Sequence, residues 1–69
     1  MPTAVEQVIE HLKQDIASFE AHARRAEELL PHLADKYKAQ WKAAIEARWR
    51  QATELSALLQ EIQKDHPGN

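Results

Sequence analysis

The stretch LLPHLAD, residues 29–35, decides how this chain folds, because Pro31 interrupts a sequence that otherwise favours helix. A proline inside a helix removes one backbone hydrogen bond and clashes with the preceding turn, which costs about 3 kcal/mol. The residues on both sides are mostly good helix formers, and the single glycine is Gly68, near the end of the chain. No alternating run of β-branched residues indicates a strand. The sequence therefore predicts an all-α protein with a break at the proline.

Upstream of the break, apolar residues recur every three or four positions and form one stripe along a helix. The stripe consists of Val5, Ile9, Leu12, Ile16, Phe19, Ala23, Ala26 and Leu30. Thr3 followed by Glu6 matches a capping box, in which the hydroxyl and the carboxylate each bind a free backbone N–H group. We expect this first helix to extend over about residues 4–30.

A second stripe follows the break and is offset from the first by one position, as in a helix that restarts after a turn. Its members are Ala34, Tyr37, Trp41, Ile45, Ala52, Leu55, Leu59 and Ile62. Asp35 is a candidate N-cap of this helix, and Pro31 is a candidate first residue. A Pro-Gly pair near the end of the chain is a stop signal. We expect a turn at about 31–34, a helix at about 34–65 and a flexible tail at 66–69.

The two helices have similar lengths, so an antiparallel hairpin would bury both stripes within a single domain, residues 1–69. One long kinked helix that oligomerises is the alternative, and the absence of a glycine at the break leaves it open. At about 100° per residue, the apolar arc of the second helix covers nearly half its circumference, which is more than a two-helix seam needs. The uncovered flank would be an exposed apolar surface, which usually marks a contact with another protein. We therefore expect a homodimer that forms a four-helix bundle, or a complex with another helical protein.

The composition argues against several functional classes. The chain has 69 residues and a net charge of −2, which fits a small folded domain better than a polycationic nucleic-acid binder. The absence of cysteine removes disulfides and cysteine-type zinc sites. The sequence has neither an apolar segment long enough for a membrane nor a signal-peptide pattern, so we expect a cytoplasmic protein. It also lacks a Gly-rich phosphate loop and a nucleophile in a catalytic context, so we expect neither an enzyme nor a cofactor.

The predicted interaction surface combines apolar residues on the flank of the stripes with one arginine. These residues are Leu29, Leu33, Arg48, Trp49 and Leu58. Arg48 falls on the apolar stripe itself, where a buried charge needs a partner. It could be a snorkelling or ion-paired arginine that fixes the register of the helices, or a specificity contact to a carboxylate or phosphate of a partner. The surface predicts a small adaptor, regulator or co-chaperone that acts by protein–protein interaction.

The stretch KYKAQWKAAIEARWR, residues 36–50, suggests a nucleic-acid-binding surface as the alternative function, because it interleaves cations with aromatic residues. A helical wheel places three of its residues on the apolar stripe, where we expect them to be core: Tyr37, Trp41 and Ile45. Three others share one flank and form the candidate nucleic-acid site: Lys38, Lys42 and Trp49.

Three polar residues on the first helix, His11, Asp15 and His22, lie along one ridge and are candidate metal ligands. The two histidines are 11 residues apart, which is about 16 Å along a helix. One ion with ligand distances of about 2.0–2.2 Å cannot bind both. We therefore expect no metal site within one chain, and only a site shared between chains is left open.

Overall fold

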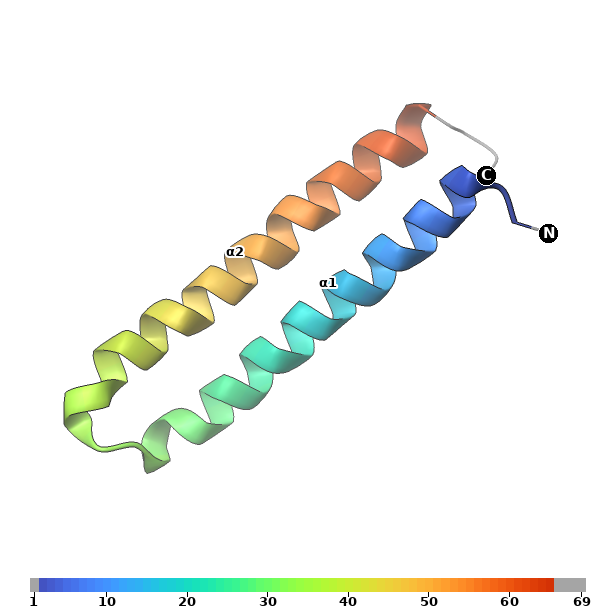
Figure 1. The fold of residues 1–69 in the computed structure, drawn as a ribbon. Coiled ribbons are helices and arrows are strands. Elements are labelled where there is room, and N and C mark those ends of the chain that lie inside the picture. The colour runs from blue at the N-terminus through green and yellow to red at the C-terminus, as the bar shows by residue number, and fades with distance from the viewer. Residues whose placement is uncertain (1, 66–69) are drawn as a thin grey trace.

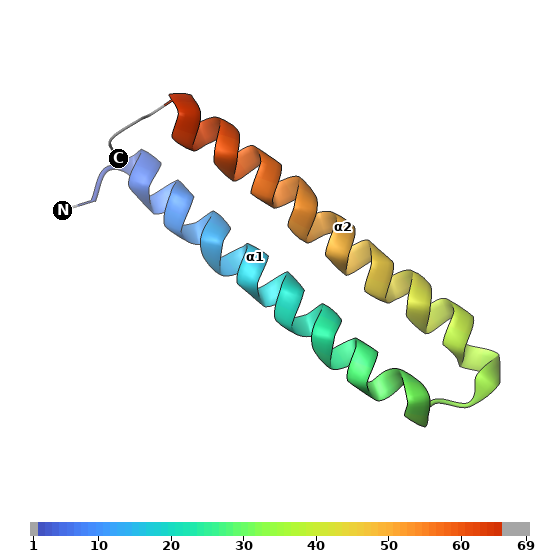
Figure 2. The same cartoon turned by 180° about the vertical axis from the view of Figure 1, so that it is seen from behind.

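The computed structural model describes residues 2–65, which form two long α-helices joined by a short turn. Helix α1 extends over Ala4–Leu29, the 3₁₀ turn η1 over Leu30–His32 and helix α2 over Asp35–Asp65. The helices lie side by side and run in opposite directions (Figures 1 and 2). The prediction of an all-α chain with two helices is confirmed for the part that the structure describes. The predicted tail at 66–69 lies outside the described residues.

Thr3 starts α1 in the way its sequence context predicts. Its side-chain Oγ1 accepts a hydrogen bond from the backbone N–H of Glu6 at 3.1 Å, and its carbonyl accepts one from the N–H of Gln7 at 3.0 Å. The hydroxyl thus satisfies one of the N–H groups that have no partner within the first turn. This bond is the first half of the predicted capping box.

Pro31 ends α1 and reverses the chain. The backbone N–H of Leu30 donates to the carbonyls of both Ala26 and Glu27, which tightens the last turn into 3₁₀ geometry. Leu33 then has φ −84° and ψ 150°, an extended conformation that any residue can adopt. The reversal therefore needs no glycine. Because the chain turns back here, one continuous kinked helix does not describe this structure.

The hairpin is a single layer of two helices. Its principal extents are 49 × 20 × 13 Å, and the smallest of them is about the diameter of one helix with its side chains. The Cα radius of gyration is 15.7 Å, whereas a compact domain of this length would have about 11 Å. Domains generally bury their core between two or three layers. In this structure, both broad faces of the hairpin border solvent.

The seam between the helices is correspondingly thin. The buried apolar residues are Ile9, Leu12, Ala23, Ala26, Ile45 and Ala52. Half of them are alanines, which bury little apolar area each and let the helices approach closely. On α1 the buried residues form two rows, Ile9 with Ala23 and Leu12 with Ala26, and the members of each row are 14 residues apart. On α2, Ile45 and Ala52 are seven residues apart, so the seam follows the heptad pattern of packed helices.

The prediction that Tyr37 belongs to the core is wrong, since its side chain is 49% exposed. Trp41 is half-buried and Ile45 is buried, in agreement with the prediction for those two residues. The difference arises from the heptad repeat. Rows of residues spaced by seven follow the seam, and Tyr37 belongs to the row of Ala44, one heptad later, which lies at the edge of the seam.

Candidate functional site

The large apolar side chains that the hairpin leaves exposed are regularly spaced along each helix. Among the described residues they are Val8 (48% exposed), Leu29 (37%), Tyr37 (49%) and Leu58 (46%). Two lie on α1 and two on α2, and each pair is separated by 21 residues, or three heptads. Because the seam itself follows the heptad repeat, the members of each pair lie on the same side of their helix.

Near the turn, the two helices present these residues on the same face of the hairpin. Leu29 of α1 and Ala44 of α2 line one groove. Tyr37 precedes Ala44 by one heptad, so it lies on that same side of α2. Leu29 and Tyr37 therefore form an apolar pair at the turn end of this face.

At the open end, the corresponding pair is formed by Val8 and Leu58. Val8 and Ile62 line a second groove between the helices, and Leu58 lies one turn before Ile62 on α2. The face that carries both pairs is named the apolar face below. Its exposed large side chains are Val8, Leu29, Tyr37 and Leu58.

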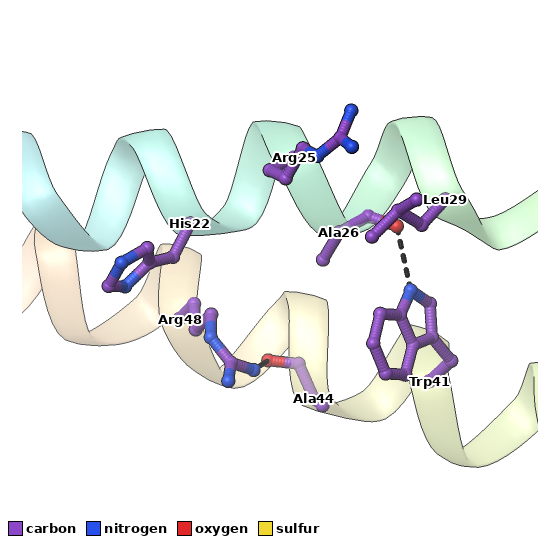
Figure 3. A pocket seen from close by; sticks show the side chains of 7 residues that line it. All are labelled: His22, Arg25, Ala26, Leu29, Trp41, Ala44 and Arg48. Atoms are coloured by element: carbon purple, nitrogen blue, oxygen red, sulfur yellow. Dashed lines mark hydrogen bonds between the residues drawn. The ribbon is translucent and has the colours of Figure 1, made fainter.

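Between the two pairs, a groove of about 300 Å³ opens on the apolar face (Figure 3). Its lining residues are His22, Arg25, Ala26, Leu29, Trp41, Ala44 and Arg48. The indole of Trp41 reaches from α2 to α1, where its Nε1 donates to the backbone carbonyl of Ala26 at 2.7 Å. The groove therefore has an apolar floor, and its rim carries one histidine and two arginines.

Of the two structural alternatives for Arg48, the snorkelling arginine agrees with the structure, because its side chain is exposed and not buried in an ion pair. Its Nη1 donates to the carbonyl of Ala44, one turn earlier on α2, at 3.2 Å. The aliphatic stem borders the groove while the guanidinium reaches solvent, as long cationic side chains commonly do. The partner of Arg48 within the hairpin is thus its own helix backbone, and no carboxylate on α1 is needed to hold it.

Trp49 lies on the face opposite the apolar face. Its Nε1 donates to the Glu27 carboxylate at 2.6 Å, and the Arg24 guanidinium lies 5.9 Å from the ring centroid. Glu27 and Leu29 are two residues apart on α1, so they point in directions about 200° apart.

The five residues of the predicted partner-binding set therefore do not share one face. Leu29, Arg48 and Leu58 share the apolar face, Leu33 is half-buried in the turn, and Trp49 packs on the far side.

The candidate nucleic-acid site is partly neutralised by acidic neighbours. Lys38 is half-buried, and its Nζ lies 3.1 Å from Oδ1 of Asp35. Trp49 already binds the Glu27 carboxylate, while Lys42 is exposed. A carboxylate beside a cation weakens its attraction for phosphate, so nothing in this arrangement favours nucleic-acid binding over the interaction hypothesis. The alternative stays a prediction.

The histidines on α1 have different surroundings. His11 Nε2 lies 3.3 Å from Oδ2 of Asp15, one turn later, whereas His22 lines the groove. Within residues 2–65, no three His, Cys, Asp or Glu side chains come together in a way that could hold a metal ion.

Within residues 2–65, neither helix is sufficiently long and apolar to cross a membrane.

Two residues of the apolar face, Val8 and Tyr37, were missing from the predicted interaction surface. Val8 lies one position outside the regular stripe of α1, and the stripe of α2 predicts a core position for Tyr37. A signal for both is present in the sequence, namely the 21-residue spacing that links Val8 to Leu29 and Tyr37 to Leu58.

Comparison with known proteins finds no family model, no curated protein and no solved structure that matches this chain.

Proposed function

We propose that the protein is a non-enzymatic interaction module that associates with itself through the apolar face, so that two hairpins form a four-helix bundle. The observation that supports this proposal is the clustering of exposed apolar side chains. All four large ones among the described residues lie on one face of a one-layer molecule. A contiguous apolar face on a small protein usually marks a contact with another protein.

The dimensions of the face suit a second hairpin. Stable interfaces bury roughly 800 Å² on each partner, and the broad side of the hairpin measures 49 by 20 Å. A second hairpin would convert one layer into two, which is the minimum for a shared core. It would also cover a seam in which alanines provide half of the buried residues.

The biological role that fits such a bundle is that of an adaptor, regulator or co-chaperone. The small size of the chain and the absence of a catalytic motif in its sequence support this role. A helix of another protein could cover the same face, because helix-in-groove recognition uses similarly spaced apolar residues. The homodimer is preferred because two copies cover each other's apolar faces at once, as two-fold interfaces do.

Sedimentation across a range of protein concentrations tests the proposal. We expect a reversible shift from one chain of 7.9 kDa to a species of twice that mass as the concentration rises. An apolar contact should also persist when salt is raised from 50 to 200 mM. A chain that stays monomeric at high concentration would contradict the homodimer and would leave the apolar face for a foreign helical protein.

A further inference from the structure

We infer that the two hairpins pack face to face in opposite directions, with Asp15 of each copy against His22 of the other. This inference rests on the proposed dimer and adds to it an orientation and a polar contact. The occupant of the apolar face is thus a second copy of this chain, with its turn lying over the open end of the first.

The distribution of charge along the hairpin supports this orientation. The half next to the turn, residues 19–47, contains five lysines and arginines and five acidic residues. The open half, residues 2–18 and 48–65, contains four lysines and arginines and six acidic residues. The net charges are therefore 0 and −2. An antiparallel arrangement keeps the two acidic halves apart, whereas a parallel one places them against each other, which is unfavourable.

The apolar pairs are spaced so that both can be covered at once in the antiparallel arrangement. A two-fold axis across the middle of the face brings α1 onto α1 and α2 onto α2 of the second copy. Leu29 then meets Val8 of the second copy, and Tyr37 meets its Leu58. Because both pairs are separated by 21 residues, the two contacts form in the same register.

The same register brings an acidic residue to the basic rim of the groove. Asp15 follows Val8 by one heptad, and His22 precedes Leu29 by one heptad, so the two lie level across the interface. The Asp15 side chain is 43% exposed, and its neighbour on α1 is His11 at 3.3 Å. His22 is exposed and lines the groove (Figure 3). A carboxylate at this point would accept a hydrogen bond from the imidazole. The neighbouring Arg25 is already paired with Glu28, whose Oε2 lies 3.0 Å from the Arg25 Nη1.

Arg48 is compatible with this packing although it lies close to the two-fold axis. It is next to the midpoint between Tyr37 and Leu58, so the two copies of Arg48 approach each other. Each guanidinium, however, binds the carbonyl of Ala44, one turn closer to its own turn end. In an antiparallel dimer the two turns lie at opposite ends, so the guanidinium groups diverge.

A charge-exchange cycle on the dissociation constant of the dimer tests the contact. Asp15→Lys removes the acceptor, and His22→Glu places a second carboxylate against Asp15. With two symmetric contacts per dimer, we expect each single variant to weaken the dimer by about fivefold. The double variant places opposite charges across the interface and should return to within about twofold of wild type. Such recovery measures the coupling between the two positions.

The control pair is Lys13 and Glu20, which are also seven residues apart on α1 but lie in the row of Glu27, on the face opposite the apolar face. Glu20→Lys changes the charge as much as Asp15→Lys does. We expect neither it nor Lys13→Glu to change the dissociation constant by more than about twofold, because charges on the opposite face of the hairpin are screened from the interface.

Crosslinking gives an independent measure of orientation, because the chain has no native cysteine. A mixture of Val8→Cys and Leu29→Cys chains should form a disulfide between chains. A mixture of Leu29→Cys and Tyr37→Cys should form one only in a parallel dimer. A dimer with no coupling between positions 15 and 22, or with the second crosslinking pattern, would overturn the orientation and leave the proposed function intact. A monomeric wild-type chain would overturn both.

Discussion

Replacing both Leu29 and Leu58 with glutamate is expected to raise the dissociation constant of the dimer by at least about 100-fold. The two leucines lie at opposite ends of the apolar face, so every symmetric dimer that uses this face buries both. Four carboxylates would enter the interface without partners, and an unpaired buried charge costs several kcal/mol. A loss of about 3 kcal/mol already corresponds to a factor of about 100. Sedimentation equilibrium measures the change.

The matched control for this variant is Ala21→Glu with Ala57→Glu. Both alanines are exposed, one on each helix, and they lie on the outer sides, away from the seam. The control therefore adds the same charge to the same helices without touching the apolar face. It should dimerise as wild type does. If the leucine variant also stayed dimeric, the apolar face would not be the interface.

The second large effect is expected at Trp41, which links the two helices next to the turn. Trp41→Ala removes a half-buried indole that packs over the groove and binds the carbonyl of Ala26. Truncation of a large aromatic residue in a core costs about 3–5 kcal/mol, and we expect the lower end here because the ring is only half-buried. For a domain of this size, about 3 kcal/mol lowers the thermal midpoint by more than 10 °C.

Trp41→Phe separates packing from hydrogen bonding at this position. It keeps an aromatic ring and removes only the N–H donor, which contributes about 1 kcal/mol. The Ala26 carbonyl still accepts from the N–H of Leu30, so no buried acceptor is left without a partner. Urea unfolding followed by circular dichroism, at one fixed protein concentration, gives both free energies. Equal losses in the two variants would show that the hydrogen bond, and not the packing, holds the helices together.

The helices and the position of the turn could be predicted from the sequence, because both depend on local chemistry. Apolar residues at helical spacing indicate the helices, and Pro31 cannot continue one. The start of α2 at Asp35 and the end of α1 at Leu29 differ by one residue from the predicted bounds. Such information is contained within a few neighbouring residues.

The faces of the hairpin could not be predicted in the same way, because they depend on where the second helix lies. On an isolated wheel, Trp49 and Leu58 bound one continuous apolar arc. In the structure, α1 divides that arc, and Trp49 binds Glu27, 22 residues away in the chain. Nothing in the periodicity of α2 indicates this partner. The choice between the two structural alternatives for Arg48 is a similar case, since it depends on how much of α2 the first helix covers.

The turn has a further consequence, which concerns the entropy of closing the hairpin. The Trp41–Ala26 hydrogen bond closes a loop of 15 residues, whereas contacts at the level of Val5 and Ile62 close a loop of 57. Loop-closure entropy makes the longer closure about 1 kcal/mol less favourable. We therefore expect contacts next to the turn to form first and those at the open end to form last. In the proposed dimer, the turn of the second copy would lie over this open end. Association would therefore order the part of the chain that lies farthest from its own turn.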